Sequence, residues 1–212
     1  MTTTDPCDPH LQPARPSRRS LLQGSAGALA AGLTSAPWHT ATAQKRGGTL
    51  KVSNGGDPPD FDVQQTATFL TQFIGAPCYS TLMRADPDNP NQLLPDLAEK
   101  AEVSADGRTV RFQLRKGVVF HNGSALTPDD VVYSLNRIKS PPKGIVSPRK
   151  GLLGNVEDIR PDGALGVTVR LAQPQPDFLM LVSNPFNVII SRAVAEPLDQ
   201  QGQGVKRQVV GT

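Results

Sequence analysis

The chain has 212 residues and a formal net charge of +3 at pH 7. Acidic and basic residues are interleaved, so the sequence gives no support for nucleic-acid binding, which needs a clustered basic face. The chain also contains no apolar run near the roughly 20 residues that span a bilayer comfortably.

The first segment has the features of a cleaved export signal. Arg18 and Arg19 stand in the stretch SRRSLLQ, which resembles the twin-arginine export motif with Leu and Gln where Phe and Lys are usual. A mildly apolar run from Leu21 to Leu33 follows, and Ala41 and Ala43 then give a small-x-small cleavage pattern. We predict export by the Tat machinery and cleavage after Ala43. The alternatives are a short amphipathic helix or a membrane anchor.

After removal of residues 1–43, the remaining cysteine and histidine residues are too few to form the active sites of common enzyme classes. Cys7, His10 and His39 leave with the signal, so Cys78 has no internal disulfide partner and His121 is the remaining histidine. A zinc site needs three or four ligands, and a catalytic triad would have to use His121, in a turn. We therefore predict no catalytic residue, no metal site and no cofactor. A lipid-anchored receptor needs a cysteine at the end of the apolar run, and none is there.

The remaining chain opens with a strand-like segment at 45–52, which Asp57-Pro58-Pro59 ends. A helix is expected from Thr66 to Leu82, ended or interrupted near Pro77. A short strand from Leu82 to Asp86 follows.

A hairpin is predicted around Asp106-Gly107, since glycine tolerates the positive φ of tight turns. The segment Thr109–Leu114 alternates polar with apolar residues, which indicates a half-buried strand with Val110, Phe112 and Leu114 facing inward. Its partner is expected at Ala98–Val103.

A capped helix is predicted after the turn at residues 121–124. Thr127 is its N-cap, Pro128 fits the first helical position, and acidic side chains follow at the positive end of the helix dipole. Val131, Leu135 and Ile138 then recur at helical spacing and form one apolar face.

These elements together resemble a known family, the family 5 extracellular solute-binding proteins. The matching residues, in order, are Asp106-Gly107, Thr109, Phe112, Leu114-Arg115, Gly117-Val118, Phe120-His121, Gly123, Leu126-Thr127, Asp130-Val131 and Ser134. The stretch Gly47-Gly48-Thr49-Leu50 and the stretch Leu93–Ala98 also resemble the family. The resemblance implies an extracytoplasmic receptor of an ABC importer for peptides, nickel complexes or related solutes.

The rest of the chain resembles the family only thinly. Residues 141–149 are predicted to be an ordinary surface connection. Residues 156–160 and 167–171 should form a second hairpin about Pro161-Asp162-Gly163. A short helix at 176–182, a buried strand at 186–190 and a helix capped by Ser191 should follow.

Short strands, hairpins and helices without a regular βαβ repeat predict an α+β fold. The resemblance places it in the type II periplasmic-binding-protein architecture, as the incomplete first lobe of a two-lobed receptor. We expect residues 1–43 to be the signal and residues 44–212 to be the N-terminal part of the solute-binding domain. The last residues resemble the point where family members continue with Gly-Pro-Phe, so we expect a truncated gene or a fragment.

Two places should approach the ligand cleft by local resemblance to the family. One contains Gln65, Thr66 and Thr68, and the other contains Asn184, Phe186 and Asn187. The alternative for each is a structural role as a helix cap or a turn, and a turn is favoured for Asn184 because it precedes proline.

The predicted function is solute capture without chemistry. The partners would be a peptide or similar small solute and the ABC permease subunits at the membrane, and the complete receptor would be a soluble periplasmic monomer. Residues 44–212 alone are expected to bind solute weakly and to aggregate. The alternatives are a non-functional remnant and a single-lobe secreted interaction module that binds no solute. The sequence does not identify the solute.

Overall fold

The computed structural model describes residues 47–212. The predicted export motif at Arg18 and Arg19, the cleavage pattern at Ala41 and Ala43 and the boundary at residue 43 lie outside the described residues. The body described below begins at Lys51. Residues 47–58 contain no helix or strand, so the strand-like segment predicted at 45–52 is wrong over its described part, 47–52.

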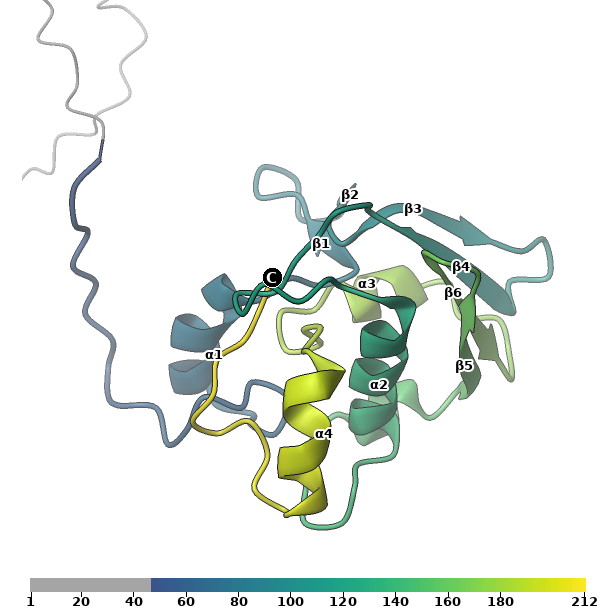
Figure 1. Cartoon of the computed structure of the whole chain (residues 1–212). Helices are drawn as coiled ribbons and strands as arrows, with labels where there is room; N and C mark the ends of the chain where they lie inside the picture. Colours follow the sequence, from purple (N-terminus) through teal and green to yellow (C-terminus); the bar gives the residue numbers. More distant parts are fainter. Residues whose placement is uncertain (1–46) are drawn as a thin grey trace, which may run out of the picture. The chain divides into compact units, whose positions relative to one another are not determined.

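The larger of the two sheets within residues 47–212 is antiparallel and has the strand order β3-β4-β6-β5 (Figure 1). Its strands are β3 (Ala98–Val103), β4 (Thr109–Leu114), β5 (Val156–Asp162) and β6 (Gly166–Leu171). Both predicted hairpins are therefore present. The second turn is displaced, since Asp162 still pairs with Gly166 across the two strands.

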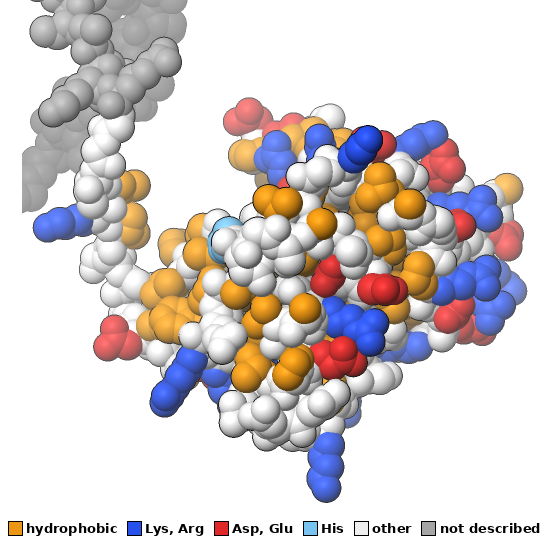
Figure 2. Space-filling view, in the orientation of Figure 1, with side chains coloured by type: hydrophobic (Ala, Val, Ile, Leu, Met, Phe, Trp, Pro, Cys, Tyr) orange, Lys and Arg blue, Asp and Glu red, His pale blue; other side chains and the backbone are white. Residues whose placement is uncertain are grey.

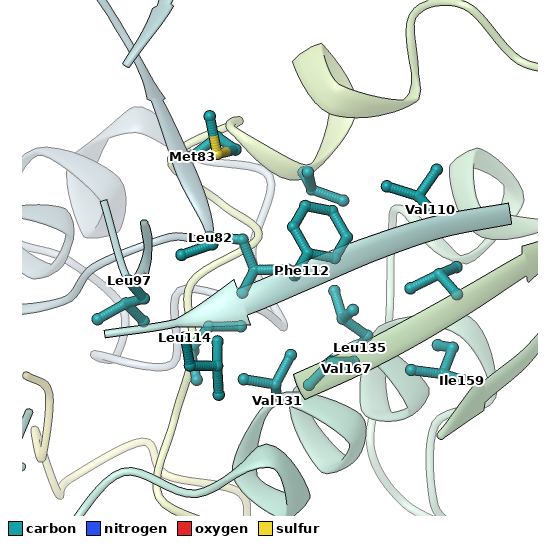
Figure 3. Close-up of a cluster of buried hydrophobic side chains, with 14 of the residues drawn as sticks. Leu82, Met83, Leu97, Val110, Phe112, Leu114, Val131, Leu135, Ile159 and Val167 are labelled. Carbon is teal, nitrogen blue, oxygen red and sulfur yellow. The ribbon is translucent and has the colours of Figure 1, made fainter. Parts of the chain in front are cut away.

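The first hairpin forms as its sequence predicts. Gly107 has a φ of 66°, the left-handed region that favours glycine. Val110, Phe112 and Leu114 are each exposed by 2% or less, so alternate side chains of β4 enter the core. Figure 3 shows these side chains packed with residues from neighbouring elements.

Helix α2 (Pro128–Lys139) packs against β5 and β6 and is the predicted capped helix. The Asp130 carboxylate accepts hydrogen bonds from the Thr127 backbone N–H at 2.9 Å and the Thr127 hydroxyl at 2.7 Å. Val131, Leu135 and Ile138 are almost fully buried. Capping fixes where the helix begins, and the apolar face fixes which side meets the sheet.

The helix predicted for Thr66–Leu82 is shorter than expected. Helix α1 (Phe69–Gly75) begins after Thr68, whose hydroxyl accepts a hydrogen bond from the Leu70 N–H at 3.2 Å. It continues into a 3₁₀ turn, η1 (Ala76–Cys78), and ends at Tyr79, where the backbone becomes extended. Strand β1 (Met83–Ala85) then pairs with β2 (Leu93–Pro95) in a separate two-stranded sheet.

Three helical elements complete the body. They are η2 (Lys150–Leu153), α3 (Phe178–Val182) and α4 (Arg192–Gln200), whose N-cap is Ser191 as predicted. Figure 1 shows α4 beside α2, in agreement with the contacts between them.

The buried strand predicted at 186–190 is wrong as secondary structure, although Val188, Ile189 and Ile190 are buried. One backbone hydrogen bond, from the Ile189 N–H to the Ser80 carbonyl at 2.9 Å, and two side chains take the place of a sheet ladder there. Gln64 Nε2 donates to the Val188 carbonyl at 2.9 Å, and the Ile190 N–H donates to Ser134 Oγ at 2.9 Å. The backbone groups are therefore paired without a neighbouring strand.

Candidate ligand-binding site

The two segments predicted to approach the ligand cleft lie beside each other. The rings of Phe69 and Phe186 have their centroids 6.2 Å apart and are tilted by 54°. This separation is within the range of favourable aromatic pairs. Residues more than 100 positions apart in the sequence therefore contribute to one surface.

In the first segment, all three predicted residues hold the backbone. Gln65 is half-buried; its Nε2 donates to Asp62 Oδ2 at 2.8 Å, and its Oε1 accepts from the Val146 N–H at 3.1 Å. The Thr66 hydroxyl accepts from the Thr68 N–H at 3.1 Å, and Thr68 caps α1. These contacts agree with the alternative given above, a structural role as a helix cap or a turn. Ligand contact by the three residues stays a prediction.

The second segment is a turn followed by a buried residue. Asn184 is exposed, and its Oδ1 accepts from the Phe186 N–H at 3.0 Å, as a turn residue does. Asn187 is 1% exposed and its Nδ2 donates to the Leu181 carbonyl at 2.7 Å. The Asn187 Oδ1 is buried and has no hydrogen-bond partner among the described residues. Ligand contact by Asn184, Phe186 and Asn187 also stays a prediction.

Arg149 joins the two segments, although no pattern in the sequence indicated a functional role for it. Its Nη1 donates to the Thr66 carbonyl at 2.8 Å, and its Nη2 donates to the carbonyls of Val63 at 3.0 Å and Gln64 at 2.9 Å. The guanidinium carbon lies 4.4 Å from the centre of the Phe186 ring, a cation–π contact. Residues 141–149 form a connection without helix or strand, as predicted, but Ile145, Ser147 and Arg149 are buried, so the connection is not purely a surface one.

A buried ion cluster lies directly behind the first segment. Arg137 on α2 donates to Asp62 (Nη2–Oδ2, 2.7 Å) and to Asp199 on α4 (Nε–Oδ2, 2.6 Å). Asp62, Arg137 and Asp199 are each 2% exposed or less, and the Tyr133 hydroxyl also donates to Asp199. The cluster ties the backbone before Gln65 to two helices.

The electrostatics of this cluster favour its charged form. Burial by itself raises the pKa of Asp62, but hydrogen bonds and the positive charge of Arg137 hold that pKa below its ordinary value. Burial also lowers the pKa of Arg149, and the negative charge of Asp62 opposes that shift. Arg137 thus pairs with both buried aspartates, and Arg149 feels the negative charge of Asp62 without forming an ion pair with it.

The surface next to these segments is apolar. Phe69 and Phe73 lie one helical turn apart on α1 and are 70% and 64% exposed, and Ile74 is 41% exposed. Figure 2 shows hydrophobic side chains gathered on the molecule where Figure 1 draws α1. Large exposed apolar patches are typical of ligand-binding and protein-interaction sites, so this surface is a candidate for either role.

Other candidate sites have weaker support. Within residues 47–212 no group of three or more His, Cys, Asp or Glu side chains is arranged to hold a metal ion. A surface depression of about 540 Å³ lies between the end of α4 and the loop 202–208, and none of the six predicted ligand residues lines it. None of the described helices has the length and apolar character needed to cross a membrane.

Two curated proteins that are similar to this chain are named as peptide-binding or peptide-transport proteins. Di/tripeptide-binding protein 2 of Pseudomonas aeruginosa is 30% identical over 181 residues, which cover 78% of this chain and 34% of that protein. The peptide transport periplasmic protein SapA of Salmonella typhimurium is 30% identical over 207 residues, covering 88% of this chain and 38% of that protein. The chain spans about a third of the length of the curated relatives it matches.

Solved structures share the fold. The dipeptide-binding protein of Pseudoalteromonas sp. SM9913, solved in complex with Met-Leu, matches 74% of this chain and 34% of its own at 25% identity and a TM-score of 0.65. The periplasmic binding protein DppA of Helicobacter pylori, solved with the peptide STSA, matches 74% of this chain at 24% identity and a TM-score of 0.64. The predicted α+β, type II periplasmic-binding-protein-like fold is confirmed.

The family model described as bacterial extracellular solute-binding proteins, family 5 (middle region), matches residues 92–212, more than half of the chain. That range contains the hairpin, the turn and the capped helix on which the resemblance was drawn. The chain belongs to the family 5 bacterial extracellular solute-binding proteins.

Proposed function

We propose that this chain is part of a peptide-binding receptor that delivers its solute to an ABC importer. The observation that carries the proposal is the junction of the two segments, 65–69 and 184–187, beside an exposed apolar surface. Curated relatives are named for di- and tripeptides, and a structural relative was solved with a dipeptide.

The receptor would capture its solute without chemical change. Small-solute sites combine an apolar surface with a few polar groups that fix orientation. Phe69 supplies exposed apolar area. Gln65 and Asn184, on the same two segments, would supply polar groups. A peptide would add main-chain hydrogen bonds of strand-like geometry, and lobe closure would bury it. No catalytic residue, metal or cofactor is part of the proposal.

Export and location belong to the same proposal. Residues 1–43 would direct the chain through the Tat machinery, with cleavage after Ala43. The receptor would then be a periplasmic, soluble monomer without a lipid anchor, and its ligand-loaded form would dock on the permease subunits.

The proposal is tested by isothermal titration of the exported receptor, at the length its gene encodes, against di- and tripeptides. Met-Leu is the first probe, and the free amino acids Met and Leu are the controls. We expect one-to-one binding of at least one peptide with a dissociation constant in the micromolar range or below. The absence of binding by any peptide to folded receptor would contradict the proposal.

A further inference from the structure

Arg149 is an unusual buried arginine because its hydrogen bonds go to backbone carbonyls. It is 9% exposed, and its two terminal nitrogens donate to the carbonyls of Val63, Gln64 and Thr66. Among residues 47–212, no carboxylate lies within ion-pair distance of it. The side chain therefore fixes the path of the backbone and makes no local ion pair.

The same guanidinium also fixes the second segment. It stacks on Phe186, and Phe186 in turn contacts the exposed ring of Phe69. Phe69 follows the cap residue Thr68, two positions after the Thr66 carbonyl that Arg149 holds. One planar group thus contacts both segments of the candidate ligand site.

We propose that Arg149 is a positioning residue for ligand binding: it holds the backbone at residues 63–66 and the ring of Phe186 in the arrangement that the peptide contacts. The inference rests on the proposed function. It assigns a role to a residue that lies on neither predicted ligand-binding segment. Arg149 acts through those segments, and its two terminal nitrogens donate to protein carbonyls.

The chemistry of arginine explains the choice of residue. The flat guanidinium donates in several fixed directions and stacks on aromatic rings at the same time. A lysine ammonium at this position keeps the charge but supplies a point-like donor without a stacking face. Arg149→Lys should therefore disturb the site although it preserves the charge, and Arg149→Met should disturb it more.

The test combines amide hydrogen exchange with peptide titration on the exported receptor. The variants are Arg149→Lys and Arg149→Met. The control is Leu153→Ala, a core residue of the neighbouring η2 turn that is 1% exposed and makes none of these contacts. We expect both Arg149 variants to accelerate exchange together at the amides of Gln65, Thr68, Phe186 and Asn187. We also expect binding of Met-Leu, or of the best peptide found, to weaken by roughly tenfold or more.

The control separates positioning from general loss of stability. Leu153→Ala should lower the melting temperature and leave the dissociation constant of the folded receptor unchanged. Unchanged exchange at the two segments, or equal effects of Leu153→Ala on exchange and affinity, would overturn the inference. If the unmodified receptor binds no peptide, the proposed function fails, and the exchange experiment alone decides whether Arg149 couples the segments. If Arg149→Met does not fold, Arg149→Lys and Phe186→Leu provide the comparison.

Discussion

Arg137 and Asp62 are 75 positions apart in the sequence, and the Arg137 Nη2 lies 2.7 Å from the Asp62 Oδ2 with both side chains almost fully buried. Asp62 also accepts a hydrogen bond from the Val205 N–H at 3.0 Å. This pair therefore fixes the approach to the first ligand segment against α2 and against the chain that leaves α4.

Replacing Arg137 with methionine should destabilise the protein strongly. The change leaves two buried aspartates without their positive partner, which costs about 3–5 kcal/mol of unfolding free energy. Urea denaturation followed by circular dichroism measures it. The matched control is Arg170→Met, which breaks an exposed pair with Glu157 and should change stability by less than about 1 kcal/mol. Equal losses of unfolding free energy in both variants would show that the buried pair stabilises the protein no more than the exposed pair does.

The Asp62 carboxyl should titrate below its ordinary value of 3.8 in the folded protein, because Arg137 stabilises its ionised form against the effect of burial. A depressed folded pKa gives stability that is fully present above the unfolded pKa and is lost as the pH falls through the folded pKa. The unfolding free energy contributed by Asp62 should therefore be constant near neutral pH and should decrease below about pH 4.

Carbon-13 NMR of the aspartate carboxyl groups measures this titration directly. A midpoint for Asp62 at or above 3.8 would be inconsistent with the buried ion cluster described above.

Phe69→Ala should weaken peptide binding with little effect on stability. The side chain is 70% exposed and pairs with Phe186, and an aromatic contact with a ligand contributes enough to change affinity by roughly threefold to tenfold. Isothermal titration with the best peptide measures the change. Phe73→Ala is the matched control, since Phe73 is 64% exposed and lies one turn further along α1. A larger loss of peptide affinity for Phe73→Ala than for Phe69→Ala would contradict ligand contact at Phe69 and would indicate contact at Phe73.

The double variant Arg18→Lys, Arg19→Lys should block export, because the twin-arginine motif depends on both residues. Cell fractionation should find uncleaved precursor in the cytoplasm, whereas the Arg15→Lys control should be exported normally. N-terminal sequencing of the exported product should begin at Gln44. Export of the double variant at the normal level would reject the Tat assignment.

Much of the fold follows from rules that act over a few residues. Gly107 sets a turn, alternation buries Val110 and Phe112, and Thr127 with Asp130 begins α2. Each of these signals is complete within one short stretch of sequence. For this reason the hairpin and the capped helix were predicted with nearly the observed bounds.

The interior behind the candidate site could not be predicted in the same way. Gln64 reaches the Val188 carbonyl across 124 positions, and Arg149 reaches the Val63 carbonyl across 86. Such side-chain to backbone bonds leave no periodic pattern in the sequence. The local resemblance nevertheless selected two segments that the fold brings together, while the arginine that joins them was missed because turn-forming residues surround it.

The most direct test of the account is amide hydrogen exchange of the exported receptor with and without a saturating peptide identified by titration. We predict slower exchange with peptide at residues 65–69 and at residues 184–187 together. Protection confined to other parts of the chain, such as the loop 202–208 beside the surface depression, would contradict the assignment of these two segments as the ligand site.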